Sequence, residues 1–307
     1  MKKNTSLNSQ RHGARFAATG VVAMMACAGA AVDTKPATHE INSPWQAGPN
    51  LVHVLAPDNV EPGKKYRTLY MLPVEAGENS HFGNPLDEAR VLDLANRHQV
   101  FCVYPTFSEM PWFADHPKDS KKGQESYFIQ DVIPFVEAHY PVLAERQGRY
   151  LVGFSKSGWG VFSLLLRHPG LFEKAASFDA PLTQEKVGPW GSGLIFGDQA
   201  TFDAYRPDLL FRKHAPEYRG GSPRFVLMGS LLFKKHTDEA SALLRELGIP
   251  HRLDAWQSKR HHWKSDWLDK AVQMLLDESA DGDALEPPAA SPLQQPGLDV
   301  SKAMNQP

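Results

Sequence analysis

The stretch Arg149-Tyr-Leu-Val-Gly-Phe-Ser155-Lys-Ser-Gly-Trp-Gly160 decides the fold of this chain. It begins with an apolar run typical of a buried strand and continues into a helical pattern over residues 157–167. The intervening Gly153-Phe-Ser-Lys-Ser157 is close to the pattern G-x-S-x-G, in which a strained strand-to-helix turn projects a serine hydroxyl above the sheet. Both flanking positions have to be small because the two backbones nearly touch, and Ser157 replaces the usual second glycine. The stretch therefore predicts Ser155 as a nucleophile at a sheet edge.

Strand-like and helix-like segments alternate over the rest of the chain, which predicts the α/β class. Repeated strand-then-helix units imply a mostly parallel central sheet with helices on both faces. Ligands of such sheets bind at the carboxyl ends of the strands, so we expect the chemistry just after each strand. Pro134 predicts a kink or a break in the helix that contains it. The expected strands are 51–55, 67–72, 100–104, 149–152, 174–178, 224–228 and 251–256, and the expected helices are 86–98, 124–140, 157–167, 238–247 and 263–276.

A serine hydroxyl is a weak nucleophile at neutral pH, so it needs a histidine base and an acid that orients the imidazole. The histidine is expected in the loop after the last strand, where Gln257-Ser-Lys-Arg-His261-His262 precedes the closing helix. We take His261 as the base, with His262 as the alternative.

The position of the acid is less regular. It is usually found directly after the strand that here covers residues 224–228, but no carboxylate follows that strand until Asp238. Asp179 directly follows the preceding strand, and an acid at that neighbouring position is geometrically workable. We therefore favour Asp179 over Asp238. Either residue could instead serve as a helix cap or a turn residue, as aspartate often does.

The same chemistry needs two backbone N–H groups that bind the negative oxygen of the intermediate. One is expected from Lys156, directly after the serine. The other is expected from the loop after the strand 67–72. Because Pro73 has no N–H, Val74 and Glu75 are the candidates there.

Three tryptophans are candidates for lining a substrate pocket. Trp112 comes after the strand 100–104, Trp159 is four residues past the nucleophile, and Trp190 lies in the long loop after Asp179. Ordinary hydrophobic cover is an equally good interpretation, because aromatic residues supply much of any protein core. No Cys/His cluster has the spacing of a metal site and no phosphate-binding loop occurs, so we expect no metal and no other cofactor.

The first thirty residues differ from the rest of the chain. They combine basic residues, a short apolar run and Ala28-Gly-Ala30, which is typical of a secretory signal peptide over residues 1–30. The run is shorter than a membrane span, so no span is expected in the mature protein. We therefore expect export to the periplasm or the medium, with a lipid anchor at Cys27 as the alternative.

Composition also sets the domain limits. Residues 278–307 are acidic and proline-rich, which predicts a flexible tail after a single hydrolytic domain over residues 31–277. The chain has 33 Lys and Arg residues against 35 Asp and Glu residues. It therefore lacks the basic surplus that a nucleic-acid partner would need.

The sequence resembles the putative-esterase group of α/β-hydrolases, which is related to esterase D and to enterochelin and feruloyl esterases. The likeness implies the α/β-hydrolase fold and serine-dependent hydrolysis of a small or carbohydrate-linked ester through an acyl-enzyme. Two positions depart from the group: Pro73 replaces a histidine-glycine turn, and the acid is missing after residues 224–228. The stretches that carry the likeness are Tyr66-Arg-Thr-Leu-Tyr-Met-Leu-Pro73, Gly153-Phe-Ser-Lys-Ser-Gly158, Leu164-Leu-Leu-Arg-His-Pro-Gly-Leu-Phe-Glu-Lys-Ala-Ala176 and His261-His-Trp263.

Two other functions fit the same sequence. One is a peptidase of the same fold, which would use the same nucleophile on an amide bond. The other is a binding protein or impaired enzyme that retains the fold, and the missing acid after residues 224–228 is the feature that favours it. Covalent reaction of Ser155 with a fluorophosphonate separates an enzyme from a binding protein.

Overall fold

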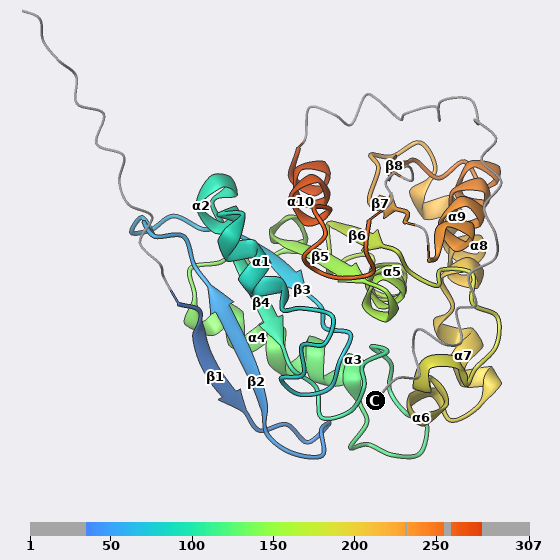
Figure 1. The fold of residues 1–307 in the computed structure, drawn as a ribbon, viewed down its shortest axis with the longest axis horizontal. Coiled ribbons are helices and arrows are strands. Elements are labelled where there is room, and N and C mark those ends of the chain that lie inside the picture. Colours follow the sequence, from blue (N-terminus) through green and yellow to red (C-terminus); the bar gives the residue numbers. More distant parts are fainter. Residues whose placement is uncertain (1–34, 231, 255–258, 278–307) are drawn as a thin grey trace, which may run out of the picture. The chain divides into compact units, whose positions relative to one another are not determined.

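A mostly parallel sheet, eight-stranded within the described residues, forms the centre of the fold (Figure 1). The computed structural model describes residues 35–230, 232–254 and 259–277. The predicted signal peptide, Cys27 and the predicted tail lie outside the described residues. The strand order is β1-β2-β4-β3-β5-β6-β7-β8. The strands are β1 (Ala37–Ile41), β2 (Asn50–Leu55), β3 (Arg67–Met71), β4 (Val100–Pro105), β5 (Arg149–Phe154), β6 (Lys174–Phe178), β7 (Phe225–Met228) and β8 (His251–Asp254).

The strands from β3 to β8 run parallel, whereas β2 is antiparallel to both β1 and β4. Every residue of β4 and β5 is buried, as expected for parallel strands that are covered on both faces. The carboxyl ends of β3, β5, β6, β7 and β8 consequently lie along one edge of the sheet. This is the edge at which parallel sheets bind their ligands.

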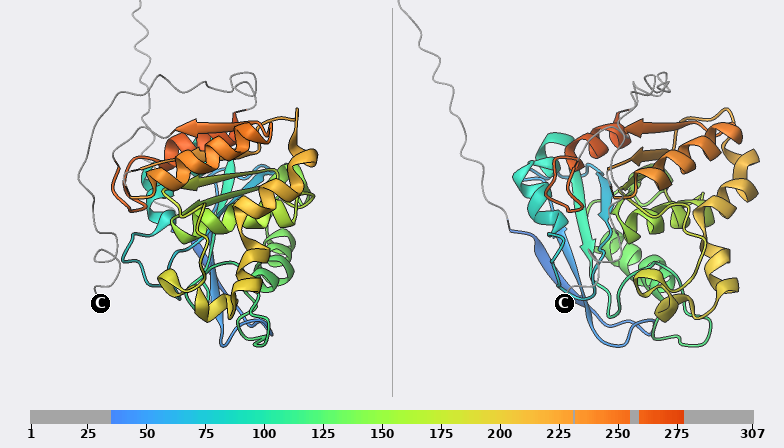
Figure 2. Two further views of the ribbon diagram at one scale, coloured as in Figure 1. Left: turned by 90° about the vertical axis from the view of Figure 1, so that its right-hand side faces the viewer. Right: turned by 45° about the vertical axis from the view of Figure 1, so that its right-hand side comes forward.

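Helices cover both faces of the sheet (Figures 1 and 2). Alternate residues of β3 show the division: Leu69 belongs to the buried cluster that includes residues of the helices within 85–98 and 268–276, whereas Tyr70 belongs to the cluster that includes residues of the helices 133–139, 156–167 and 234–246. The α/β class and the two-sided arrangement predicted from the sequence are confirmed. The helices are α1 (Pro85–Val91), α2 (Leu94–His98), α3 (Gln124–Tyr127), the π-helical η1 (Phe128–Val132), α4 (Ile133–His139), η2 (Arg146–Gly148), α5 (Lys156–Arg167), η3 (Pro189–Gly191), α6 (Gly193–Phe196), α7 (Gln199–Tyr205), α8 (Pro207–Tyr218), α9 (Lys234–Glu246) and α10 (Leu268–Leu276).

Two predicted helices differ in detail from the structure. The helix expected over 86–98 is two helices, interrupted at Asp93, whose φ of 53° is left-handed. The helix expected over 124–140 continues past Pro134, with a π-helical turn directly before the proline. The Ile133 amide reaches back five residues to the Phe128 carbonyl. That wider turn accommodates a proline without ending the helix.

One further helix begins later than predicted, and several elements were not predicted. The closing helix begins at Leu268 rather than at residue 263, so residues 259–267 form a loop, here called the histidine loop. The edge strand β1 and the helices α6 to α8 were not predicted. Pro207 at the first position of α8 is a helix-start signal that the sequence does carry. Within the described part of the chain, no helix is long and apolar enough to cross a membrane.

Candidate active site

Ser155 occupies the sharp turn between β5 and α5. Its φ of 54° and ψ of −125° lie outside the ordinary regions for a residue with a side chain. Its amide donates to the Phe178 carbonyl at 2.9 Å, which fixes the turn against the end of β6. Such strain persists only where the surrounding structure enforces it, and it is concentrated at functional sites.

The close contact of strand and helix at this turn explains its small residues. A Cβ on Gly153 would lie 2.2 Å from the Ser157 carbonyl oxygen, so only glycine fits there. A Cβ on Gly158 would lie 2.7 Å from the Ser177 hydroxyl oxygen. The Ser157 hydroxyl both accepts from the Phe154 amide and donates to the Phe154 carbonyl, each at 2.9 Å. The serine at the usual glycine position therefore adds hydrogen bonds to the turn.

His261, which is partly exposed, forms a hydrogen-bonded pair with the buried Asp179. The imidazole Nδ1 lies 2.7 Å from one carboxylate oxygen of Asp179. The other oxygen accepts from the Phe233 amide at 2.8 Å. Asp179 is 1% exposed and has a φ of 43°, in the left-handed region that a residue with a side chain seldom adopts. Both carboxylate oxygens are thus bonded, which holds the imidazole in a single orientation.

Three phenylalanine rings surround the imidazole of His261. The Phe154, Phe233 and Phe82 ring centroids lie 4.5, 5.6 and 5.7 Å from it. Its Nε2 is buried and has no hydrogen-bond partner among the described residues. Because a buried polar atom normally has a partner, this nitrogen is available to a reacting group. Phe154 directly precedes Ser155, so the free nitrogen and the turn belong to one site.

The two alternative residues have other contacts. Asp238 lies in α9, half-exposed, with a carboxylate oxygen 2.5 Å from the Lys234 ammonium. The His262 imidazole accepts from the Lys264 amide at 2.9 Å and lies over Gly83. The structure therefore brings Asp179 and His261 together, and it brings neither Asp238 nor His262 into that pair.

The candidate oxyanion amides come from two places. Lys156 is the first residue of α5, so its N–H is one of those left unpaired by a helix start, where the helix dipole favours negative charge. Val74 and Glu75 lie in the loop of residues 72–77, here called the oxyanion loop. Its Leu72 and Gly77 amides are bonded to carbonyl oxygens, and no described group accepts from the amides of Val74 and Glu75.

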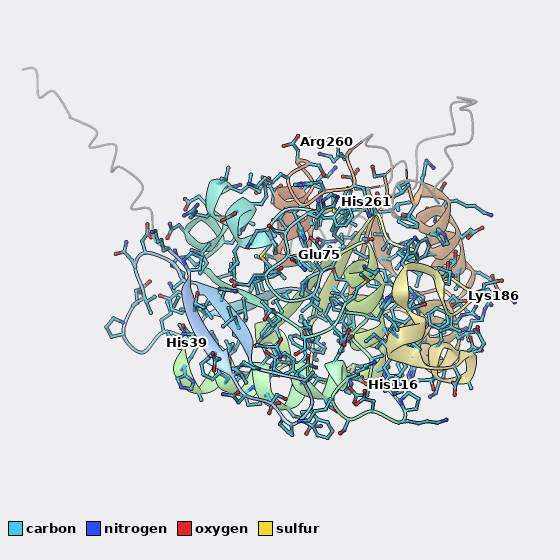
Figure 3. The ribbon with its side chains drawn as sticks, turned by 60° about the horizontal axis from the view of Figure 1, so that its bottom comes forward. His39, Glu75, His116, Lys186, Arg260 and His261 are labelled. Carbon is cyan, nitrogen blue, oxygen red and sulfur yellow. The ribbon has the colours of Figure 1, made fainter. Side chains whose placement is uncertain are left out.

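Glu75 and Lys156 also have ionisable side chains. The Glu75 carboxylate accepts from the Phe82 amide at 3.0 Å, which connects it to a ring that contacts His261. Burial lowers the pKa of Lys156 to about 8, against the opposite effect of the negative charge of Glu75. Figure 3 shows Glu75 and His261 on the loops that follow β3 and β8.

The three tryptophans have different surroundings. Trp112 and Trp159 are fully buried and pack edge to face, with ring centroids 5.4 Å apart. They belong to an aromatic cluster with Phe196 and Phe202, and a role for either of them in lining a substrate pocket stays a prediction. Trp190 retains exposed surface and packs on Phe233 at 5.3 Å.

Phe82 and Phe233 are the site residues that sequence reasoning missed. Neither lies in a motif, and each reaches His261 only through the tertiary fold. Phe154 could have been identified from the sequence, because it occupies the variable position directly before the nucleophile. In the residues the structure describes, no group of three or more His, Cys, Asp or Glu side chains could hold a metal ion.

A serine in a strained turn, with a histidine bonded to a buried carboxylate at the same edge of a mostly parallel sheet, places the protein in the α/β-hydrolase fold class. The chain belongs to the family described as "Putative esterase", which matches residues 48–222. Two curated relatives, Esterase MT1326 and Esterase Rv1288 of Mycobacterium tuberculosis, are each 27% identical over 185 residues. The match covers 53% of this chain but only 39% of either relative.

Solved structures share the fold at low sequence identity. A ferulic acid esterase has a TM-score of 0.60 at 19% identity, covering 79% of this chain and 96% of its own. The fluorophosphonate-binding serine hydrolase FphF of Staphylococcus aureus has a TM-score of 0.63 at 15% identity, with 80% and 100% covered. An S-formylglutathione hydrolase from Agrobacterium tumefaciens has a TM-score of 0.61 at 14% identity, with 78% and 94% covered.

Proposed function

We propose that this protein is a serine esterase that hydrolyses a carboxylic ester through an acyl-enzyme on Ser155. The observation that carries the proposal is the 2.7 Å bond between His261 and Asp179, which leaves the buried Nε2 free beside the nucleophile turn. This is the arrangement in which a histidine can accept a proton from a serine hydroxyl. Family membership supports the same reaction class.

The first half of the reaction follows from these positions. Ser155 Oγ attacks the carbonyl carbon of the ester while Nε2 of His261 takes the hydroxyl proton. Asp179 holds the neutral imidazole with its proton on Nδ1 and stabilises the imidazolium that forms. The negative charge moves onto the carbonyl oxygen, where the Lys156 amide and an amide of Val74 or Glu75 receive it.

The second half regenerates the enzyme. The oxyanion collapses, the bond to the alkoxy group breaks, and His261 returns its proton to the departing alcohol. Water then attacks the acyl group on Ser155, with His261 again taking the proton. Collapse of the second intermediate releases the carboxylic acid and restores the hydroxyl of Ser155.

The substrate class is proposed as a small or carbohydrate-linked ester. Trp190 supports an apolar or sugar-stacking surface beside the site, since it keeps exposed area and contacts the ring that packs on His261. Hydrolysis rates for acetyl, feruloyl and longer acyl esters would order these preferences.

Covalent labelling tests the enzyme proposal directly. A fluorophosphonate should label the protein on one serine, and Ser155→Ala should abolish the label together with hydrolysis of p-nitrophenyl acetate. Ser157→Ala is the matched control, because its hydroxyl is bonded to Phe154 and the label should remain. A folded protein that takes no label would favour a binding protein, and cleavage of oligopeptides in place of esters would favour a peptidase.

The cellular location is part of the same proposal. A secretory signal over residues 1–30 would deliver the enzyme to the periplasm or the medium. Mass spectrometry of the mature chain tests this. An N-terminus after Ala30 supports cleavage by a signal peptidase, whereas a lipid-modified Cys27 at the N-terminus supports an anchored lipoprotein.

A further inference from the structure

Phe82 contacts three parts of the candidate active site: the oxyanion loop, the histidine loop and the nucleophile turn. Its amide donates to the Glu75 carboxylate on the oxyanion loop at 3.0 Å, and its carbonyl accepts from the Trp263 amide on the histidine loop at 2.9 Å. Its ring packs edge to face on His261 and on Phe154, with centroids 5.7 and 6.1 Å away. The backbone and the side chain of one residue thus connect all three parts.

The side chain of Glu75 makes the connection to the oxyanion loop. Glu75 and Phe82 are seven residues apart in the chain. The segment between them folds back through two turns, which the amides of Asn79 and Gly83 close by donating to carbonyl groups three residues earlier. A hydrogen bond to a charged acceptor is stronger than one between neutral groups. The half-buried carboxylate of Glu75 therefore holds Phe82 against the oxyanion loop.

Three consecutive residues of the histidine loop contact Phe82 or Gly83. The His261 ring packs on the Phe82 ring, and the Trp263 amide donates to the Phe82 carbonyl. Between them, the His262 imidazole lies over Gly83, where a Cβ would come within 2.5 Å of its Cε1 atom. A displacement of Phe82 would therefore act directly on the part of the loop that carries the base.

The separation of the oxyanion loop and the histidine loop matters for the proposed reaction. Both act on one ester group, because the amides bind its carbonyl oxygen while His261 takes the proton of the attacking hydroxyl. The loops follow β3 and β8, and three strands lie between these two in the sheet. A displacement of about 1 Å in such a site can lower the rate about a hundredfold. The contacts of Phe82 constrain this separation without passing through the sheet.

We infer that the Glu75 side chain is a positioning element of the site: its carboxylate binds the Phe82 amide and so aligns the oxyanion loop with the base. This inference rests on the proposed esterase function and deepens it by naming a residue that aligns the two loops. A negative charge beside the oxyanion would by itself oppose catalysis. The bond to Phe82 explains why an acidic side chain occupies a loop whose amides bind negative charge.

Three replacements of Glu75 separate its hydrogen bond from its charge. Glu75→Met has a similar length but no oxygen acceptor, and Glu75→Asp keeps the charge but is one methylene too short to reach the Phe82 amide. Both should lower kcat for p-nitrophenyl acetate about tenfold with little change in KM, because the alignment is lost while a small ester still binds. Glu75→Gln keeps an acceptor oxygen at the same reach and should recover most of the rate that Glu75→Met loses.

Glu78→Met is the matched control, because Glu78 is an exposed carboxylate on the same segment, 3.7 Å from the His53 imidazole, and kcat should not change. All rates are measured well below the thermal unfolding midpoint of each variant, so that a lower kcat reports alignment and not loss of folded protein. Wild-type kcat in Glu75→Met and Glu75→Asp would overturn the inference, and so would an equal loss in Glu75→Gln and Glu75→Met.

Should Glu75→Met not fold, the comparison of Glu75→Asp with Glu75→Gln decides. Equal kcat in these two variants would overturn the inference, and a tenfold slower Glu75→Asp would support it. Failure of the proposed function itself would appear separately, as absence of fluorophosphonate labelling in wild type.

Discussion

The carboxyl ends of β6 and β7 contribute differently to the histidine pair. In the usual arrangement the acid follows the strand that corresponds to β7, whereas here it follows β6. After β6 comes Asp179, whose carboxylate bonds His261. After β7 come Gly229 and Ser230, with no carboxylate before Asp238. The β7 end nevertheless takes part, because the amide of Phe233 donates to Asp179. One strand end carries the charge and its neighbour holds that charge in place.

The geometry of parallel strands explains why this division works. Neighbouring strands are about 4.8 Å apart, and β6 pairs with β7 up to Phe178 and Met228. The Asp179 amide extends this pairing by donating to the Met228 carbonyl at 2.8 Å. A side chain on either strand end can therefore reach the same histidine. Such a site fixes where the acid must be in space, and not which strand provides it.

The largest expected effect is the loss of the acid on the β6 side. Asp179→Asn keeps the shape and can still accept from Phe233, but it no longer favours the imidazole tautomer that accepts the serine proton. We expect kcat for p-nitrophenyl acetate to decrease by about 10⁴ with little change in KM. Steady-state kinetics of the folded variant measures this.

The matched change on the β7 side removes the carboxylate charge of Asp238. Asp238 is paired with Lys234 at the surface of α9, so Asp238→Asn should leave kcat within about twofold of wild type. If Asp238→Asn instead abolished hydrolysis while Asp179→Asn retained it, the acid would belong to the segment after β7 and the division described above would be wrong.

Local signals in the sequence were sufficient to select Ser155, Asp179 and His261 as candidates at one edge of the sheet. A strand, a small-residue turn and a helix define Ser155, and an aspartate directly after a strand can be placed at the sheet edge without knowing its neighbours. His261 follows from its position after the last strand. These predictions depend on the residue's place along its own element, which the sequence contains.

Features set by tertiary packing could not be predicted in the same way. The sequence left pocket lining and hydrophobic cover open for Trp112 and Trp159, and only the tertiary fold shows that both are completely buried in a cluster with residues of α6 and α7. Phe82 and Phe233 are distant from His261 in the chain, and no pattern connects them to it. The start of α10 was placed too early because Trp263 and Trp267 are buried like helix residues although they belong to the histidine loop.

A smaller effect is expected when the β7 side loses its aromatic contact with the histidine. Phe233 is 2% exposed, and its ring packs against both His261 and Trp190. Phe233→Leu preserves the amide bond to Asp179 and most of the volume but removes the ring that restricts the imidazole. We expect kcat to decrease about tenfold and stability to change by less than about 1.5 kcal/mol. Unchanged kcat would mean that Asp179 alone orients His261.

The smallest expected effect concerns Ser230, through which the β7 end holds the histidine loop. Its hydroxyl accepts from the Lys259 amide at 3.1 Å and donates to the Lys259 carbonyl, two residues before His261. Ser230→Ala should cost about 1 kcal/mol of unfolding free energy and lower kcat about threefold, because the loop keeps its other contacts. Ser241→Ala is the control. Ser241 lies in α9 and is as buried as Ser230, and its hydroxyl is 2.8 Å from the His251 imidazole, away from the site. If both variants lose stability and only Ser230→Ala loses rate, the β7 end positions the base as well as the acid. Equal rates in the two variants would confine its role to the Phe233 amide.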